Sequence, residues 1–599
     1  MTTPPTNPPE PAPPGGWASP AVRGAVPYGA RAGYGPPPPQ FVYQPTKFEK
    51  ALKAWKRPAR PMSPALVAGV LVAGVIGAVA VGPQFREGLL GVGVVIAAVA
   101  VAYVAAASAW SAGRLVRPSA GKRDAAKEQD AAGKRDAAKE QDAAGKRDAA
   151  KEQDAAGKRP AVKEREAAKR RTGRVNRTAV LFGVLTVGLS AIAAFREAEW
   201  VVVPALLLAV ALGSYAASGG RSWPEVLFGG LAVVPAAGAM LPWAGRGAYG
   251  AVTSEKSNWW PAIRTALIAG GLLAVFGALF VGADAAFGSI AAGLVPEVSA
   301  LSVFVYGFTG AATLVLASAA AYLGQAPPPL RMLAPEPGRP AGRWSWAVPI
   351  AALDLLFLVF CAIQAGVFLA DDKDELLRST GLTYAEYARQ GFFQLVVVTV
   401  LVLLVVAVAK RYAPSGNGGD RATVRVLLGL LCALTLVVVA VALRRLYLYE
   451  QTFGWTRLRL WVHAFELWLG LVVVLVAVAG VVKGRVPWLP RAVAASGAAA
   501  MIALALLNPD GFIAEHNVAR YKDTGKIDVP YLRGLSADAV PALDRLPEPM
   551  RTCALRQIAF KLTENEPAMS ANLARARARK ALERRPIAES ADCFSLSRP

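Results

Sequence analysis

Long apolar runs separated by short polar stretches are the main feature of this 599-residue chain. Each run is close to the roughly 20 residues that a helix needs to cross about 30 Å of hydrocarbon. The runs cover approximately 65–82, 88–110, 178–195, 199–217, 225–242, 265–282, 299–323, 346–370, 391–409, 423–443, 460–482 and 489–507. We therefore predict an all-α fold, a polytopic helical membrane bundle of about 11 to 13 spans.

Basic residues beside the runs predict which loops face the cytoplasm. Positive clusters at 47–60 and 158–177 place the N-terminus and the loop after the second run inside. In the second half, the more basic set of loops is expected inside as well, which places the C-terminus outside; these loops are 244–264, 324–345, 410–425 and 483–491. Twelve full spans would instead put the C-terminus inside. We expect eleven crossings, because two glycines and Pro235 interrupt the run 225–242.

The segments between the apolar runs differ in composition and set the domain boundaries. Residues 1–60 form a proline-rich and then basic cytoplasmic tail, a composition typical of disordered, extended chain. Residues 111–177 are a charged linker with three identical copies of GKRDAAKEQDAA between Gly121 and Ala156. These copies have no continuous apolar stripe, which favours a solvated helical spacer. The remaining parts are a transmembrane hairpin (61–110), a transmembrane bundle (178–507) and a small helical C-terminal domain (508–599).

Composition supports the membrane class and excludes others. The chain is 54% hydrophobic and 18% charged, with a mean hydropathy of +0.36, which excludes a soluble enzyme and a wholly disordered protein. Most of the net charge of +24 lies in stretches that flank the apolar runs, where basic residues set topology and attract anionic lipid. We therefore expect the lipid bilayer of the cell membrane as partner and no nucleic acid. A protein partner is expected at the proline-rich tail or at the C-terminal domain.

One carboxylate lies inside an apolar run. Asp354 is flanked on both sides by apolar residues in the run 346–370. A charge at this depth costs about 2.5–3.5 kcal/mol even on insertion scales, so an intramembrane carboxylate is a candidate functional site. Two interpretations stay open: a proton or cation site, or a protonated or hydrogen-bonded carboxyl packed against another helix.

A polar pair lies at the start of the run 460–482. His463 and Glu466 are three residues apart, so they share one face of a helix. A metal site needs three or four ligands, and the chain has only one other histidine, His516. We therefore interpret the two residues as an interfacial polar pair, and we expect no metal and no other cofactor.

Several short polar segments are more specific than a membrane span requires. They are Ala283–Phe287, which contains Asp284, Gly381–Phe392, which contains Tyr384 and Glu386, Arg445–Glu450, Gly454–Arg459, Asn508–Arg520, Gly525–Asp528, Tyr531-Leu532, Leu535–Leu543 and Asn572–Arg579. Together they resemble a family of multi-pass bacterial membrane proteins that is filed as a domain of unknown function and is widespread in actinobacteria. The resemblance covers roughly 180–585 and implies a shared transmembrane architecture, without an activity or a catalytic residue. In one departure, Ser570-Ala571 stands where a tryptophan is expected before Asn572.

The same segments also have a structural interpretation. Thr383 to Glu386 is a capping box, so a helix is expected to start there. Asn508 is a good N-cap before a proline at the first helical position, so a helix is expected to follow the last run. On this interpretation the candidate polar residues of these segments mark helix starts and loop packing; they are Asp284, Tyr384, Glu386, Asn508 and Asp528.

Two cysteines lie in the C-terminal domain and form the pair most suited to a disulfide. Cys553 and Cys593 are separated by 39 residues, whereas Cys361 and Cys432 lie inside apolar runs. If this domain is outside the cell, an oxidising compartment permits the bridge. If all twelve runs cross the membrane, both cysteines are expected to be free thiols in the cytoplasm.

No nucleophile elbow, phosphate-binding loop, HExxH motif or dinucleotide fingerprint occurs in the sequence, so we do not expect an enzyme. We predict an integral membrane protein that acts as a scaffold or sensor, in which the spans hold the C-terminal domain in place. The alternative is a transporter or channel that uses Asp354, with Glu466 beside a polar path. A water-filled cavity at Asp354 favours transport, and a dry helix contact favours a scaffold.

Overall fold

The computed structural model describes most of the chain from residue 46 onward. The described residues are parts of 46–58, 61–113, 116–117, 174–253, parts of 264–280, 299–333, 342–369, 392–412, 418–482, 486–563, 566–588 and 593. The chain divides into two units, residues 1–46 and 47–599, and the description below concerns the second. The proline-rich tail, the repeats and the candidate residues Asp284, Tyr384 and Glu386 lie outside the described residues.

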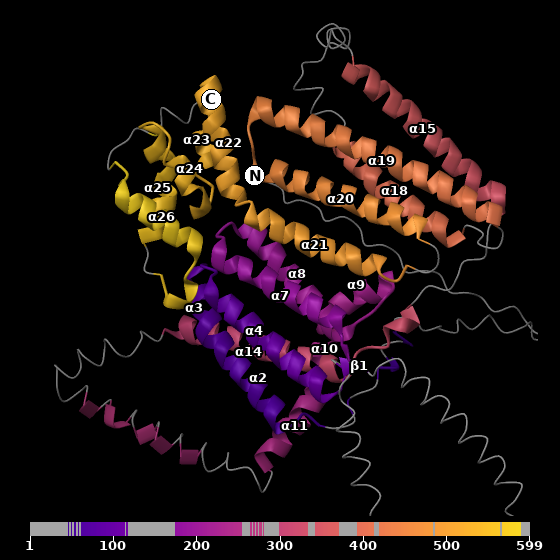
Figure 1. Ribbon diagram of the computed structural model, residues 1–599. Helices are drawn as coiled ribbons and strands as arrows, with labels where there is room; N and C mark the ends of the chain where they lie inside the picture. The colour runs from indigo at the N-terminus through magenta and orange to yellow at the C-terminus, as the bar shows by residue number, and fades with distance from the viewer. Residues whose placement is uncertain are drawn as a thin grey trace, which may run out of the picture. The chain divides into compact units, whose positions relative to one another are not determined.

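The described part of the chain is helical, as the hydrophobic pattern predicts (Figure 1). It also contains a two-residue antiparallel ladder, in which β1 (Val116–Arg117) pairs with β2 (Arg174–Val175). Within the described residues, ten helices are long and apolar enough to cross a membrane: Pro64–Arg86, Val92–Ser111, Arg177–Phe195, Glu199–Ser218, Ala300–Gln325, Trp344–Gly366, Gln394–Tyr412, Gly419–Phe453, Arg457–Val481 and Leu489–Leu506. The predicted class, an all-α polytopic bundle, is confirmed.

The helices of the first half pack together around α14. This first bundle consists of α2 (Pro64–Ile76), α3 (Gly82–Glu87), α4 (Val92–Ser111), α7 (Arg177–Phe195), α8 (Glu199–Ser218) and α14 (Ala300–Gln325). A π-helical turn, η1 (Gly77–Val81), joins α2 to α3. This turn lies close to α14, since a Cβ on Gly77 would be 2.2 Å from Oγ1 of Thr313. Small residues allow membrane helices to approach in this way.

The run 225–242 does not form one spanning helix. Pro235 lies within it and has no N–H to donate to the preceding helical turn. The run is instead divided among three short helices, α9 (Trp223–Leu231), α10 (Val233–Ala239) and α11 (Leu241–Thr253). The last of these lies near the start of α2, since a Cβ on Gly247 would be 2.4 Å from the Cβ of Met62.

A second bundle is built around α19 (Gly418–Phe453). This helix has 36 residues and is about 54 Å long, so it is longer than the roughly 30 Å of hydrocarbon. The apolar run 423–443 predicts only its middle, because charged residues such as Asp420 and Arg444 continue the helix beyond the run. Three helices pack against it or against one another there: α15 (Arg343–Leu369), α18 (Phe392–Tyr412) and α20 (Arg457–Val481).

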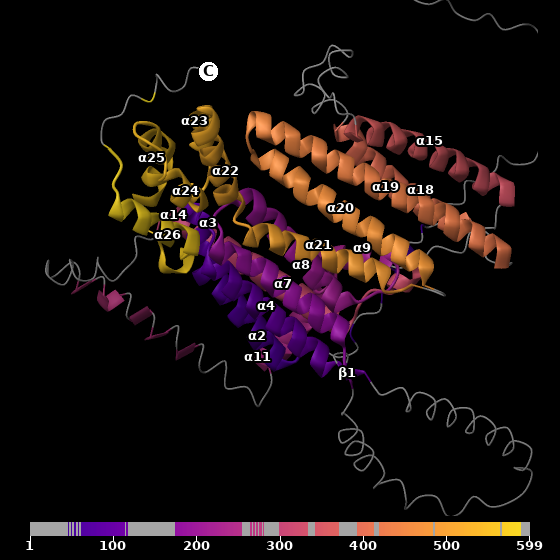
Figure 2. The same ribbon diagram turned by 45° about the horizontal axis from the view of Figure 1, so that its top comes forward.

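The two bundles and the C-terminal domain meet at α21 (Leu489–Leu506), which packs against α7, α8 and α20 (Figure 2). The C-terminal domain follows at once and consists of short helices: α22 (Pro509–Thr524), α23 (Val529–Leu532), η3 (Ala537–Ala539), α24 (Val540–Leu543), α25 (Met550–Thr563), η4 (Ala568–Ser570) and α26 (Leu573–Arg584). One hydrophobic core includes Leu189 and Val201 of the membrane helices and Ile513 and Leu543 of this domain. The C-terminal domain therefore shares a core with the helices on which it rests.

The C-terminal domain contacts one end of the bundles, here called the domain face. This end includes the loops 88–91, 196–198 and 454–456, each hydrogen-bonded to residues of the domain. The other end is here called the opposite face. There, Trp55 donates from Nε1 to the carbonyl oxygen of Ala326, after the end of α14. The start of α15 also lies toward the opposite face, because Gln364 near its other end accepts from Arg445, close to the end of α19 that leads into the loop 454–456.

Candidate functional site

Asp354 lies inside the second bundle, where α15 packs against α19. Its side chain is 4% exposed, so it faces other helices and avoids lipid, as its cost in hydrocarbon predicts. On α19 it lies near Cys432, which is also buried. Neither carboxyl oxygen of Asp354 has a hydrogen-bond partner among the described residues. Asp354 is therefore packed against α19 without a hydrogen bond among the described residues, so the proton or cation site and the protonated, packed carboxyl both stay open.

Glu466 of α20 is a second buried carboxyl in this bundle. It has no exposed surface, and its Oε1 lies 3.5 Å from Oγ1 of Thr399 on α18. Its Oε2 has no hydrogen-bond partner within the described part of the chain. Thr399 is fully buried and also donates to the carbonyl oxygen of Leu395, at 3.1 Å. The contact with Glu466 is thus long, and this carboxyl is only weakly satisfied.

His463 shares a helix face with Glu466, as predicted, but it pairs with a different glutamate. Nδ1 of His463 lies 3.0 Å from Oε1 of Glu450, a fully buried residue near the end of α19. The indole of Trp455 stacks over the imidazole at 5.5 Å with an interplanar angle of 24°. This pair is therefore covered from the domain face by an aromatic ring.

These polar residues form a series at different depths, and we call Asp354, Thr399, Glu450, His463 and Glu466 the buried polar series. Glu450 and His463 lie next to the domain face. Glu466 is nine residues into α20, or about 14 Å along the helix from that face. Asp354 is eleven residues into α15, about 16 Å from the opposite face. The series therefore extends from the domain face to the middle of the bundle.

The arrangement is unsuited to a metal ion. Within the described residues, no three His, Cys, Asp or Glu side chains come close enough together to hold one. What the series offers is proton chemistry, because an imidazole and carboxyl groups exchange protons and each of its three carboxyls has at least one oxygen without a hydrogen-bond partner among the described residues.

A buried carboxylate at Asp510 joins the C-terminal domain to two membrane helices. It accepts hydrogen bonds from Nε1 of Trp200 at 2.9 Å and from Nε and Nη2 of Arg457 at 3.0 and 2.5 Å. The backbone N–H of Ser536 donates to it at 2.8 Å. The start of α8, the start of α20 and a loop of the domain therefore meet at one side chain, which is fully buried.

Asp538 and Glu197 hold the loop between α7 and α8 against η3. Asp538 accepts from the backbone N–H of Glu197 at 2.8 Å, and Glu197 accepts in return from the N–H of Ala537. Nη1 of Arg196 lies 3.2 Å from Oδ1 of Asp538. Burial raises the pKa of both carboxyls above their ordinary values, and these N–H groups and the nearby arginines only partly offset that rise.

Asn572 fastens α26 to the end of α7. Its Oδ1 accepts from the N–H of Ala574 at 2.9 Å, which caps α26, and its Nδ2 donates to the carbonyl oxygens of Ala193 at 2.8 Å and Arg196 at 2.9 Å. Gly91 allows the neighbouring approach, since a Cβ there would lie 2.2 Å from the carbonyl oxygen of Ser570.

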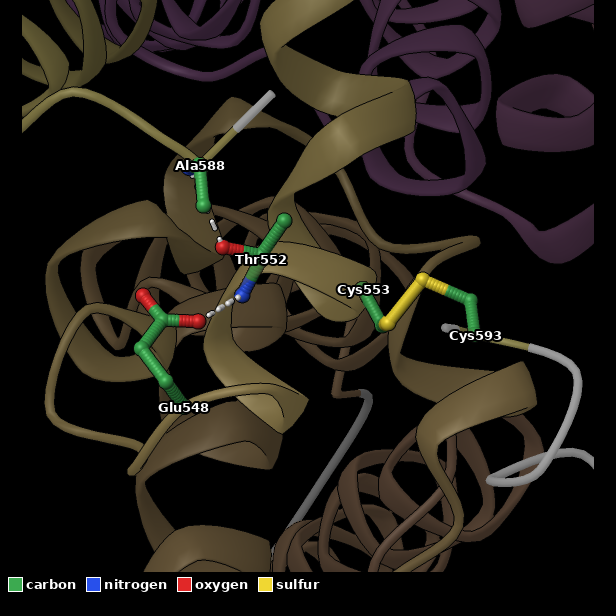
Figure 3. The surroundings of a disulfide bond; sticks show 5 residues. All are labelled: Glu548, Thr552, Cys553, Ala588 and Cys593. Atoms are coloured by element: carbon green, nitrogen blue, oxygen red, sulfur yellow. Dashed lines mark hydrogen bonds between the residues drawn. A yellow bond between two sulfur atoms is a disulfide. The ribbon is translucent and has the colours of Figure 1, made fainter. Parts of the chain in front are cut away.

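The two cysteines of the C-terminal domain are bridged. A disulfide joins Cys553 of α25 to Cys593, with Cα atoms 5.6 Å apart (Figure 3). Beside it, Thr552 donates from its N–H to Glu548 at 3.1 Å, and its hydroxyl accepts from the N–H of Ala588 at 3.3 Å. The segment after α26 is therefore attached to α25 both covalently and by a hydrogen bond.

Asn508 and Asp528 have structural roles. Asn508 precedes α22, as predicted, but its side chain does not cap the helix. Its backbone is left-handed (φ 59°), a conformation that asparagine adopts more readily than most residues, and its Nδ2 points to the carbonyl oxygen of Asp538 at 3.4 Å. Asp528 is the residue that caps, because it accepts from the N–H of Tyr531 at 2.9 Å at the start of α23.

The ten candidate spans and the buried polar series define a polytopic integral membrane protein. Residues 183–546 match a family described as Domain of unknown function (DUF4153). This match covers more than half of the chain, so the protein belongs to that family. The matched part runs from α7 to just after α24 and includes the buried polar series but not the disulfide. No curated protein and no solved structure matches the chain.

Sequence reasoning missed several residues that complete these sites. Glu450 ends one of the family-like segments, and Asp510 and Asp538 lie inside two others. The available signal was that each is a charged residue inside one of those segments. Thr399 gave no signal, because a threonine in an apolar run commonly bonds only to its own helix.

Proposed function

We propose that the domain face lies outside the cell and the opposite face in the cytoplasm. The basic segment before α2 and the basic loops of the second half support this orientation, because Lys and Arg accumulate on the cytoplasmic side. The bridge between Cys553 and Cys593 supports it independently, because disulfides persist in oxidising compartments. The N-terminus is then cytoplasmic, and the membrane is the plasma membrane.

This orientation requires an odd number of membrane crossings, and we propose eleven. Ten are the candidate spans of the described residues. α11 lies near the opposite face, whereas α14 begins at the domain face, where Ser302 accepts from Nη1 of Arg86. The chain between them has to change sides. We assign that crossing to the apolar run 265–282, which is described only in part, and none to the run 225–242.

Labelling with a membrane-impermeant maleimide tests the orientation. Lys526 is exposed on the C-terminal domain and Arg221 is exposed on the opposite face, so Lys526→Cys and Arg221→Cys form a matched pair. In intact cells we expect labelling of the Lys526 variant alone, and of both after the membrane is permeabilised. Labelling of the Arg221 variant alone in intact cells contradicts the orientation.

We propose further that the protein is a proton-coupled transporter and that Asp354 binds the coupling proton. The observation that supports this is a buried carboxyl whose two oxygens have no hydrogen-bond partner among the described residues. Asp354 lies in a helix contact, which by itself favours a scaffold, so the transport proposal rests on these two unsatisfied oxygens. Such a group does not stabilise the fold, because its desolvation is not offset by any contact. Intramembrane carboxyls of this kind mark proton and ion pathways.

The rest of the buried polar series supports a route to Asp354 from outside. Glu450 and His463 lie at the domain face, and Glu466 lies deeper, so protonatable groups continue from that face toward the middle of the bundle. Trp346 and Ile350, between Asp354 and the opposite face, are large, mainly apolar and buried. Polar access on one side and an apolar barrier on the other are expected of a transporter closed toward the cytoplasm.

Proton movement by the full chain in liposomes tests this function. A pH-sensitive dye inside the liposomes reports proton uptake while amino acids, sugars and organic cations are supplied one at a time. We expect the wild type to respond to at least one of these solutes. Asp354→Asn and Glu466→Gln keep the size of each side chain but remove its exchangeable acid proton, so both should lose the response. Asp420→Asn, at the start of α19, is the matched control and should keep it.

Two outcomes contradict the transport proposal. One is a wild type that moves no protons with any solute of the panel. The other is an Asp354→Asn variant that responds as strongly as the Asp420→Asn control. Misfolding is checked by the unfolding temperature, which Asp354→Asn should leave unchanged because the carboxyl has no partner to lose.

The attachment of the C-terminal domain favours a second candidate, a membrane scaffold or sensor that presents this domain outside. Asp510 and Asp538 tie the domain to loops of both bundles through buried charge-assisted hydrogen bonds. On this function, Asp354→Asn retains full activity. Asp510→Asn removes the negative charge that pairs with Arg457. The amount of partner protein crosslinked to the domain in intact cells should then fall.

A further inference from the structure

A cavity of about 440 Å³ lies where the C-terminal domain meets the domain face. Its walls come from four places in the sequence: the loop 88–90, the segment from Arg196 into the start of α8, one face of α25, and Arg575 of α26. Ligand sites are common at such junctions between domains. Nothing in the buried polar series contributes to this cavity.

The wall of the cavity carries three cations, Arg196, Lys561 and Arg575, and two carboxylates, Glu197 and Glu199. Arg575 is 2% exposed and shares the carboxylate of Glu566 with a second arginine, Arg579. Arg196 pairs with Asp538. Lys561 of α25 is the lining cation that forms no ion pair among the described residues, so it is available to an anion.

Arg575 also has an unused donor. Its Nε donates to Glu566 at 2.7 Å, and its Nη2 donates to the carbonyl oxygens of Leu90 and Ser570. Its Nη1 is left with Glu197, whose Oε1 is 3.9 Å away and thus beyond hydrogen-bond distance. Among the described residues, this nitrogen is the one part of the guanidinium without a hydrogen bond.

The remaining lining residues are of the kind that a lipid headgroup needs. Glu199 is exposed at the first residue of α8, which places it where this spanning helix leaves the hydrocarbon. Phe560 is 71% exposed, and Leu90 and Val202 add apolar surface below the charges. Cations and carboxylates side by side, above an apolar wall at headgroup depth, match a molecule with a phosphate, an ammonium group and hydrocarbon.

We propose that this cavity binds a phosphate ester that carries an ammonium group, the chemistry of a phosphoethanolamine headgroup. Lys561 and Nη1 of Arg575 donate to the phosphate, and Glu199 accepts from the ammonium. A phospholipid and a soluble phosphoethanolamine share this chemistry, so the experiment has an arm for each. The site does not depend on which face is outside or on whether the protein transports protons.

Native mass spectrometry of the full chain in detergent tests the site. Dioleoyl-phosphatidylethanolamine is added in increasing amounts, and the fraction of protein with bound lipid is measured. Lys561→Gln removes one charge-assisted donor and should weaken binding by about tenfold. Lys580→Gln changes an exposed lysine of α26 outside the cavity and is the matched control. Because Lys561 is exposed, its variant should fold with an unchanged unfolding temperature.

Two further arms refine the ligand. Gln557→Glu places a negative charge on the cavity face of α25, so it should weaken binding by about tenfold or more. Glu199→Gln should weaken binding of phosphatidylethanolamine more than binding of phosphatidylglycerol, which has no ammonium group. Adding O-phosphoethanolamine to the protein with bound lipid distinguishes a soluble ligand from a phospholipid. If it displaces the lipid, the headgroup chemistry is sufficient for binding. If the lipid is retained, the acyl chains are required.

The proposal is overturned if Lys561→Gln and Gln557→Glu retain as much lipid as Lys580→Gln. Equal weakening by all three variants also overturns it, because the effect would then report the net charge of the protein and not this cavity.

Discussion

Replacing Asn572 by alanine should loosen the C-terminal domain from the membrane helices. The substitution removes the cap of α26, which is worth about 1 kcal/mol. It also removes the two hydrogen bonds to the carbonyl oxygens of Ala193 and Arg196, at about 1 kcal/mol each. The sum is about 3 kcal/mol, because the side chain is 5% exposed and water cannot easily replace these partners. Opening of this contact should become about a hundredfold more frequent.

Hydrogen exchange of the α26 amides in detergent-solubilised protein measures this opening. Asp528→Ala is the matched control, because Asp528 caps α23 through one hydrogen bond and, among the described residues, forms no hydrogen bond with a membrane helix. It should cost about 1 kcal/mol and change exchange in α23 more than in α26. If both variants speed exchange of α26 equally, the bonds from Asn572 to α7 do not hold the domain in place, and the reasoning is refuted.

Four further outcomes are expected. Cys553→Ser should lower the free energy of unfolding of the domain by about 4 kcal/mol, because it removes a crosslink that limits the entropy of the unfolded chain. A decrease of less than about 1 kcal/mol in denaturant unfolding contradicts this. Because burial raises the pKa of Glu197 above 4.5, the folded state binds this proton more tightly than the unfolded state. Stability should therefore rise as pH falls through the raised pKa and level off below the ordinary value, and unfolding midpoints of Glu197→Gln should depend less on pH. Asp354→Leu should leave the unfolding temperature unchanged or higher, since leucine needs no polar partner. Deleting one or two of the repeats within 121–168 should leave the amount of protein in the membrane fraction unchanged, as an immunoblot would measure.

The class of protein and most helix positions follow from the sequence alone. Runs of about 20 apolar residues can satisfy their backbone polar groups in lipid only as helices, so hydropathy determines their structure without knowledge of their neighbours. The break in the run 225–242 was predictable for a similar local reason, since two glycines and Pro235 weaken a helix. The length of α19 was not, because its charged ends continue the helix outside the hydrocarbon, where hydropathy gives no signal.

Only the tertiary structure decided which polar residues meet. The sequence predicted that His463 and Glu466 share one helix face. Because α19 and α18 pack against that face, His463 pairs with Glu450 and Glu466 contacts Thr399. The isolation of Asp354 could not be predicted either, because a missing partner is a property of every helix around it. The sequence marks which side chains are costly to bury. Which of them find a partner depends on contacts between segments far apart in the chain, and the folded arrangement alone determines those contacts.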